Sequence, residues 1–214
     1  MTTTVLLVRH GQTTSNITGF YMGWSDEDLN ETGYTQAHAL SSRLTSLPIA
    51  SVCTSPLRRA YTTATILAEP HKLELQVSDD LIEIQLGDWQ GLHMDEVKRR
   101  WPELWRQSGI DPSEVTMPHG ESFQQVTERA VRAFEMVAAA NQGRLTVIMT
   151  HEVVIRVLVA HALGVSNSIY RRFELGNASL SVIRVVNSNF HLITLNDTSH
   201  LENQGLPPSR IRLS

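Results

Sequence analysis

The chain has 214 residues, a formal net charge of −4 and a single cysteine, Cys53. A chain of this length can form a hydrophobic core large enough to fold without disulfides or structural metals. The acidic net charge argues against a nucleic-acid-binding protein, which would usually show a basic face. The apolar runs fall short of the ~20 residues that span a bilayer, the N-terminus lacks a secretory-signal pattern, and a lone cysteine fits a reducing compartment. We therefore expect a cytoplasmic protein that does not bind membranes.

In the first half of the chain, predicted strands alternate with predicted helices. Four consecutive apolar residues, 5–8, predict a strand that is buried on both faces, as in a parallel sheet. The elements expected after it are, in order, a polar loop over 15–30, a helix over 32–47, a strand over 49–54, a helix from Ser55-Pro56 to Ala68, a short strand over 73–77, an irregular segment over 79–89 and a polar helix over 95–105 that is broken near Pro102.

The second half begins with a segment over 108–120 that contains prolines and glycines and is typical of a long loop. Ser122 and Gln125 then form a capping-box pattern, which predicts the start of a helix. The expected elements are that helix to about 141, a strand over 145–150, an apolar helix over 153–163, and two strands over 179–186 and 190–195 that are joined by a hairpin-type turn.

The alternation predicts an α/β fold, a three-layer sandwich with a mostly parallel central sheet and helices on both faces. With no internal repeat and no linker, we interpret residues 1–214 as one domain, with an insertion or lid at about 90–120. The tail over 198–214, which contains Gly205, Pro207 and Pro208, is expected to be poorly ordered.

The first strand ends in residues that suit an anion. Arg9 and His10 follow the strand directly, Gly11 lets the backbone turn sharply, and Gln12 and Thr13 add polar side chains. In open α/β sheets, ligands bind outside the carboxyl ends of the strands. The stretch therefore predicts a site for an oxyanion such as phosphate.

Arg9-His10-Gly11 resembles the Arg-His-Gly signature of the histidine phosphatase superfamily, also called the phosphoglycerate mutase-like family. Residues 55–60 (Ser-Pro-Leu-Arg-Arg-Ala) match its second signature, in which the arginine before the alanine binds phosphate. The resemblance therefore assigns phosphate binding to Arg59, and Arg58 is expected to point elsewhere. The remaining matches are Glu83, which precedes a glycine-containing turn, and His151, at the end of a late strand. The resemblance implies that His10 is the nucleophile, Glu83 the general acid, and Arg9, Arg59 and His151 the other catalytic groups.

Further binding residues follow from the same resemblance. Asn16 falls where family members carry a phosphate-contacting asparagine, and Gln12, Thr13 and Gly23 are candidate substrate-binding residues. Glu152 departs from the pattern, because many relatives have a glycine after the second histidine. Its carboxylate is expected either to point outward at the helix start, where a negative charge is favourable, or to contact a cationic or hydroxyl-rich substrate.

The resemblance implies a phosphomonoester hydrolase of the bacterial phosphatase branch that needs no cofactor and no metal. It would act on a small phosphorylated metabolite through a phosphohistidine on His10. The comparatively short stretch between Glu83 and His151 and the ending 196–201 favour a phosphatase over a phosphoglycerate mutase, which is the alternative. A third hypothesis is a non-catalytic regulatory protein that binds phosphate.

Two histidines and Glu83 could also hold a metal, but the neighbouring arginines would repel a dication, so we expect none. The sequence leaves open whether the substrate is a sugar phosphate, a phosphoglycerate or ribazole phosphate, and whether the chain forms a homodimer. The leaving group is expected against the segment 100–120 and four side chains, Met22, Trp24, Leu86 and Trp89.

Overall fold

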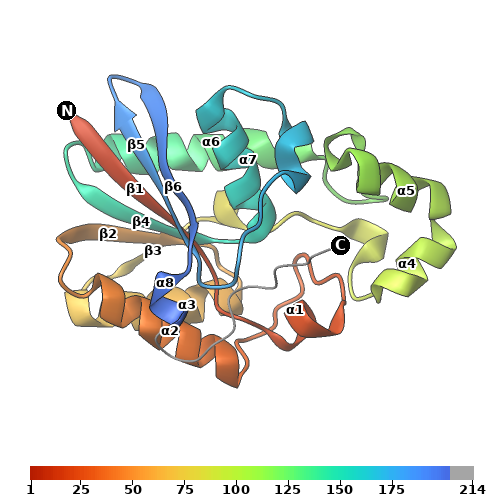
Figure 1. Cartoon of the computed structure of the whole chain (residues 1–214), viewed down its shortest axis with the longest axis horizontal. Coiled ribbons are helices and arrows are strands. Elements are labelled where there is room, and N and C mark those ends of the chain that lie inside the picture. The colour runs from red at the N-terminus through yellow and green to blue at the C-terminus, as the bar shows by residue number, and fades with distance from the viewer. Residues whose placement is uncertain (203–214) are drawn as a thin grey trace.

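The computed structural model describes residues 1–202, which fold around a six-stranded sheet with the strand order β3-β2-β4-β1-β5-β6 (Figure 1). The strands are β1 (Thr2–Arg9), β2 (Ile49–Thr54), β3 (Leu75–Val77), β4 (Leu145–Thr150), β5 (Leu180–Val186) and β6 (Asn189–Asp197). The first four pair in parallel, whereas β5 runs antiparallel to both of its neighbours, β1 and β6. The prediction of a mostly parallel sheet is therefore confirmed.

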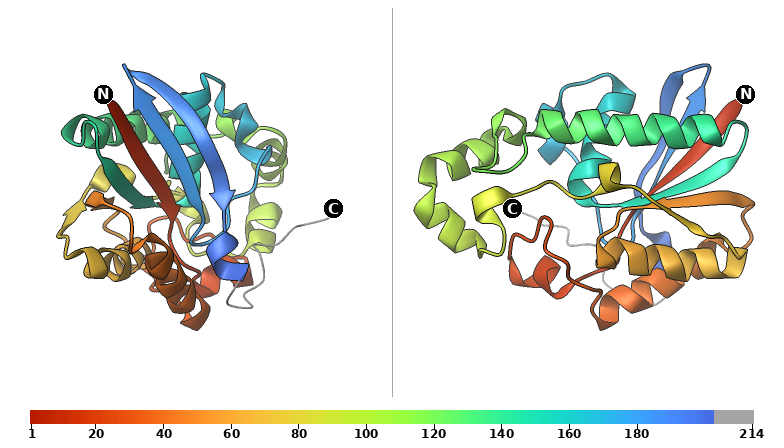
Figure 2. Two further views of the ribbon diagram at one scale, coloured as in Figure 1. Left: turned by 60° about the vertical axis from the view of Figure 1, so that its left-hand side comes forward. Right: turned by 180° about the vertical axis from the view of Figure 1, so that it is seen from behind.

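Two long helices cover each face of this sheet (Figure 2). On one face lie α2 (Glu31–Leu44) and α3 (Arg58–Ala68), and on the other lie α6 (Phe123–Ala140) and α7 (Glu152–Leu163). Helix α6 begins with the capping box that the sequence predicts, since Ser122 and Gln125 each bind the other's backbone N–H through their side chains. The three-layer α/β architecture is thus confirmed.

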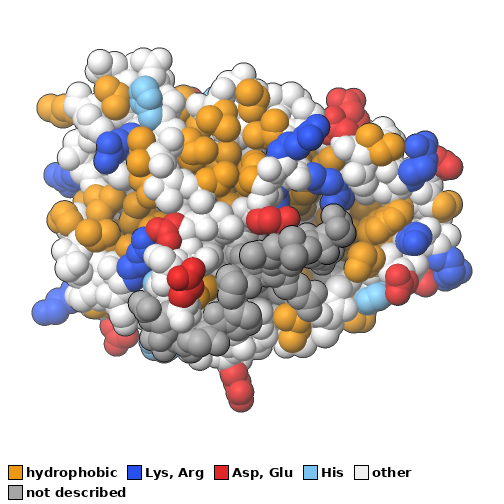
Figure 3. Space-filling model, in the orientation of Figure 1, with side chains coloured by type: hydrophobic (Ala, Val, Ile, Leu, Met, Phe, Trp, Pro, Cys, Tyr) orange, Lys and Arg blue, Asp and Glu red, His pale blue; other side chains and the backbone are white. Residues whose placement is uncertain are grey.

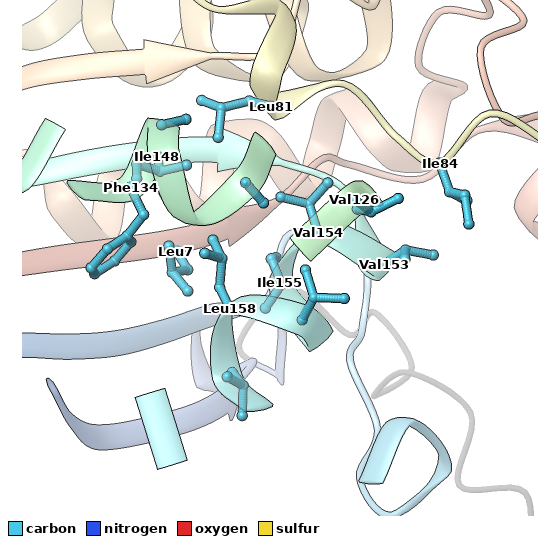
Figure 4. Packing of buried hydrophobic residues seen from close by; sticks show 14 of the residues in the cluster. Leu7, Leu81, Ile84, Val126, Phe134, Ile148, Val153, Val154, Ile155 and Leu158 are labelled. Atoms are coloured by element: carbon cyan, nitrogen blue, oxygen red, sulfur yellow. The ribbon is translucent and has the colours of Figure 1, made fainter. Parts of the chain in front are cut away.

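Strand β1 shows why its residues are apolar on both sides. Leu6 and Val8 pack in the layer that contains Leu40 of α2. Leu7 points to the opposite layer, where it packs in the same cluster as Phe134 of α6 (Figure 4). Because both faces of the strand are buried, its position in the sheet is fixed, and so is the direction in which the chain leaves it.

Shorter elements complete the chain. The short helices are α1 (Thr14–Thr18), α4 (Met94–Arg100), α5 (Pro102–Ile110) and α8 (Ser199–Glu202), and single 3-10 turns lie at Glu69–His71, Asp79–Leu81, Gly87–Trp89, Pro112–Glu114 and Asn167–Arg171. Helices α4 and α5 extend beyond the end of the sheet, on the right of Figure 1. The predicted polar helix is indeed broken at Pro102, which begins α5.

Three expectations need correction. The segment 15–30 is not entirely a loop, because α1 forms there; Thr13 caps it with Asn16, and its five residues are too few to show helical periodicity. Helix α2 ends at Leu44 rather than at 47. The start of the expected tail is not irregular throughout, since it contains the short helix α8, which buries Leu201. The rest of that tail, 203–214, lies outside the described residues.

Within residues 1–202, no helix combines the length and the hydropathy that a membrane span requires. On the face shown in Figure 3, acidic and basic side chains are interspersed among polar and hydrophobic ones.

Candidate active site

The candidate site forms where three strands end side by side. Strand β4 lies between β1 and β2 and is parallel to both, so their carboxyl ends reach the same edge of the sheet. The pairing continues past the strands, because the backbone N–H of His10 donates to Thr150 (3.0 Å) and that of Ser55 donates to Met149 (3.0 Å). As a result the rings of His10 and His151 lie 5.2 Å apart, centroid to centroid.

His10 is buried, with 3% of its surface exposed. Its Nδ1 lies 2.7 Å from the carbonyl oxygen of Gly11. Because a carbonyl oxygen can only accept, Nδ1 carries the proton and Nε2 keeps its lone pair. Burial, followed by the charges of Arg59 and Arg9, holds the pKa of His10 well below its ordinary value of 6.5. The ring is therefore neutral near pH 7, as a nucleophile must be.

His151 is completely buried beside it, and its Nε2 lies 2.7 Å from the Ser55 hydroxyl oxygen. Its Nδ1 has no hydrogen-bond partner within the described part of the chain. Burial lowers the pKa of His151 as well, with Arg59 as the next cause. A buried nitrogen without a partner is unfavourable, so a ligand atom within reach of Nδ1 would be stabilised there.

The structure separates the two neighbouring arginines of α3 as the sequence predicts. Arg59 points into the site, where its guanidinium donates to the carbonyl oxygens of Ser25 (2.8 Å) and Gly23 (2.7 Å). Arg58 points outward and forms an ion pair with Asp28 (3.0 Å). The loop carbonyls hold the buried Arg59 in place without neutralising its charge.

Arg9 reaches the same site from the end of β1. Its Nη1 donates to the carbonyl oxygen of Leu175 (2.5 Å), and its Nη2 lies 2.9 Å from a carboxylate oxygen of Glu152. Its Nε is buried and has no partner among residues 1–202. The guanidinium is thus fixed by Leu175 and Glu152, and its Nε–H is among the N–H groups left for a ligand.

Glu83 lies on the irregular segment that follows β3, and its carboxylate lines the site. One oxygen accepts from the backbone N–H of Ile84 (2.9 Å). Burial raises the pKa of Glu83 above its ordinary value of 4.5, although the Ile84 N–H and Arg59 oppose that rise. A carboxyl group in this position can hold and release a proton.

Glu152 does not point outward at the helix start, the first of the two expected arrangements, whereas its contact with a substrate stays a prediction. Its carboxylate faces the site but is bound by arginines on both sides, Arg9 through one oxygen and Arg156 through the other (2.8 and 3.0 Å). Burial would raise the pKa of Glu152, yet Arg9 and Arg156 together hold it below its ordinary value. The residue is therefore a fixed counter-ion of the chain itself.

The remaining predicted residues divide into two groups. Thr13, Asn16 and Gly23 line the same cavity as His10, whereas Gln12 lines an adjoining hollow. The Asn16 side-chain oxygen accepts from the N–H of Thr13 and from the side chain of Asn177 (both 2.9 Å). With its oxygen engaged, Asn16 has its amide N–H groups left to donate to a ligand.

The cavity has a volume of about 230 Å³. Met22, Leu86 and Trp89 form part of its wall as expected, but Trp24 does not; its indole N–H donates instead to the carbonyl oxygen of Glu83. The segment 100–120 contributes Ser108, Pro112 and Met117 to the wall. Across residues 1–202, no three His, Cys, Asp or Glu side chains are grouped as a metal site would require.

The wall also contains Tyr170 and Arg171, which lie between α7 and β5 and which no sequence motif indicates. The same holds for Arg129 and Glu121, which hold the backbone around Glu83. Neither pair carries a local signal, because charged residues on a helix or in a loop usually face solvent.

Comparisons with known proteins identify the family of the chain. The sequence model of the histidine phosphatase superfamily (branch 1) matches residues 5–198. Phosphoserine phosphatase 1 of Hydrogenobacter thermophilus is 35% identical over 197 residues, which cover 92% of this chain and 93% of that protein. The metal-independent phosphoserine phosphatase of Arabidopsis thaliana is 33% identical over 210 residues, covering 95% and 85%. Among solved structures, Bacillus stearothermophilus YhfR superposes with a TM-score of 0.89 at 30% identity, covering 93% of this chain and 99% of that one. The chain therefore belongs to the histidine phosphatase superfamily, branch 1, and is a phosphatase.

Proposed function

We propose that this phosphatase hydrolyses a small phosphomonoester through a phosphohistidine on His10, without a metal or another cofactor. The observation that supports this most directly is the state of His10. Its Nδ1 proton is held by Gly11, its pKa is lowered, and its Nε2 lone pair is left free in a cavity flanked by Arg9 and Arg59. A neutral imidazole in a cationic pocket suits attack on a phosphate ester.

In the first step, Nε2 of His10 forms a bond to phosphorus while the bond from phosphorus to the ester oxygen breaks. Glu83, in its protonated form, gives its proton to the departing oxygen. Arg9, Arg59 and His151 stabilise the charge on the phosphoryl oxygens, with Thr13, Asn16 and Gly23 as further contacts. Bound phosphate carries about two negative charges, which offset the arginines and favour the acid form of Glu83.

In the second step, a water molecule attacks phosphorus, and the carboxylate of Glu83 takes the proton that the water loses. The bond between phosphorus and Nε2 breaks, inorganic phosphate leaves, and both residues return to their starting states. A phosphoglycerate mutase would instead pass the phosphoryl group to a second hydroxyl, and the two outcomes are separated by the identity of the acceptor.

The substrate is inferred to be small. The cavity of about 230 Å³ lies below the range of roughly 300–1,000 Å³ that is usual for drug-sized ligands. Two of the relatives reported above are named phosphoserine phosphatases, so O-phospho-L-serine is the first compound to test.

The test is phosphate release from p-nitrophenyl phosphate and from O-phospho-L-serine, by the parent protein and by His10→Ala, with and without a chelator. We expect turnover by the parent that the chelator does not change and that His10→Ala abolishes. Loss of activity on chelation would contradict metal independence, and a regulatory protein that only binds phosphate would release none.

A further inference from the structure

Arg171 is a third arginine in the wall of the cavity, and the proposed mechanism does not use it. It ends the 3-10 turn at Asn167–Arg171, and its Nε and Nη2 both donate to the carbonyl oxygen of Ser108 in α5 (3.2 and 3.0 Å). These bonds anchor the guanidinium at the wall. They leave its Nη1 without a hydrogen bond to any residue from 1 to 202.

The charge of Arg171 is not balanced in the way that the neighbouring charges are. Arg9 and Arg156 share the carboxylate of Glu152, whereas no carboxylate within the described residues forms an ion pair with Arg171. The charge also acts across the cavity: burial raises the pKa of the Tyr21 phenol, and Arg171 opposes that rise. Arg171 is exposed to solvent and its charge also lowers the pKa of Glu152, but no ion pair occupies its Nη1 among residues 1–202, so this nitrogen can donate to an anion that enters the cavity.

In the proposed mechanism Arg9 and Arg59 bind the phosphoryl group beside His10, and Arg171 lines the same cavity without a part in that step. We propose that Arg171 binds a carboxylate on the leaving group, so that the preferred substrates are O-phosphorylated hydroxy acids or amino acids. This rests on the proposed function of the site. In such molecules four bonds separate phosphorus from the carboxyl carbon, which suits a small cavity, and a guanidinium binds a carboxylate through paired N–H groups.

The test compares two matched pairs of phosphate esters that differ in the carboxylate. O-phospho-L-serine is paired with O-phosphoethanolamine, and 3-phosphoglycerate is paired with glycerol 3-phosphate. The proteins are the parent, Arg171→Gln and Arg172→Gln. Glutamine keeps an N–H that can donate to Ser108 but removes the charge. Arg172 is the adjacent exposed arginine, and it lines neither cavity, so it serves as the control.

We expect the parent to prefer the carboxylate-bearing member of each pair. Arg171→Gln should raise KM for that member by about 10- to 100-fold, the scale of a hydrogen bond to a charged group. Its kcat should change little, because the carboxylate keeps its charge during the reaction. The other two substrates should be unaffected, and Arg172→Gln should behave as the parent.

Two results would overturn the inference. An equal loss on all four substrates would mean that Arg171 only anchors α5 through Ser108, and no loss on any of them would mean that it binds no substrate group. If the parent hydrolyses none of the four, nor p-nitrophenyl phosphate, the proposed function fails instead. Calorimetric titration of the four compounds into His10→Ala, with and without Arg171→Gln, then measures the carboxylate preference without turnover. Tighter binding of the carboxylate-bearing compounds that is lost with Arg171→Gln supports the inference. Absence of that preference in His10→Ala refutes it.

Discussion

The guanidinium of Arg129 donates its Nη2 to the backbone carbonyl oxygen of Glu83 at 3.0 Å. The same side chain donates to the carbonyl oxygens of Asp80 and Ile82, and it forms a two-pronged ion pair with Glu121 (2.9 Å at both prongs). Helix α6 thereby holds the irregular segment that carries Glu83. This contact connects the core of the molecule to the group that we propose as the acid.

Arg129→Lys should therefore weaken both the fold and the acid function. Lysine keeps the charge but cannot donate to several carbonyls at once. We expect a loss of about 2 kcal/mol in the free energy of unfolding, since hydrogen bonds from charged donors are lost in a largely buried place. Turnover of alkyl phosphates should fall more than that of p-nitrophenyl phosphate, whose leaving group needs no proton.

Urea denaturation and a series of phosphates of graded leaving-group pKa measure the two effects. Arg132→Lys is the matched control, because Arg132 is exposed on the same helix and, among residues 1–202, its side chain binds only that of Asp80. An equal fall for alkyl and aryl phosphates would show that Arg129 supports the fold alone.

The two arginines at the start of α3 provide a second comparison. Arg59→Ala should cost about 3–4 kcal/mol of transition-state stabilisation, the scale for removing one preorganised donor from a charge-stabilising pocket. Arg58→Ala should cost far less, because its ion pair with Asp28 is largely exposed. The ratio of kcat/KM values measures both, and the reverse ranking would refute the assignment of Arg59.

The pH dependence of kcat/KM for an alkyl phosphate should be bell-shaped. His10 must be neutral, so activity is lost as the pH falls through its lowered pKa. Glu83 must be protonated, so activity is lost as the pH rises through its raised pKa. Glu83→Gln should remove the basic limb, because an amide has no proton to lose there. Ionisation of the substrate is common to both proteins and cancels in their ratio. If the basic limb persists unchanged in Glu83→Gln, that limb reports the ionisation of another group.

Glu152→Gln should release Arg9 from its counter-ion. The site then becomes more positive, so inorganic phosphate should inhibit several-fold more strongly, which a Ki determination measures. The dependence on leaving-group pKa should stay as in the parent. If Glu152→Gln steepens that dependence and Glu83→Gln does not, the acid is Glu152.

The parts that the sequence predicts well depend on local signals. The apolar run that becomes β1, the capping box at Ser122 and the apolar stretch 153–163 that becomes most of α7 each lie in or next to the element that they define. The ends of parallel strands meet at one edge, so the placement of His10 and His151 at the same edge is predictable, whereas the direct pairing of β1 with β4 that brings their rings together is not. Phosphate binding is assigned to Arg59 rather than to Arg58 by a motif that lies within a few residues of both.

What the sequence leaves out is set by contacts between distant segments. Arg156 of α7 lies over the rings of Tyr170 and Phe173, which places the segment between α7 and β5 against the site. Nothing in the periodicity of that segment indicates the packing. The arrangement of Glu152 was likewise not predictable, because it depends on Arg156, one helix turn away, and on Arg9 from the far end of the chain.

The central claim is that the phosphoryl group passes through His10. Rapid quenching of the parent protein with ³²P-labelled substrate should trap label that is labile in acid and stable in base, as a phosphohistidine is, and peptide mapping should place it on His10. His10→Ala should carry no label and show no turnover. Label on another residue, or appreciable activity in His10→Ala, would contradict the mechanism.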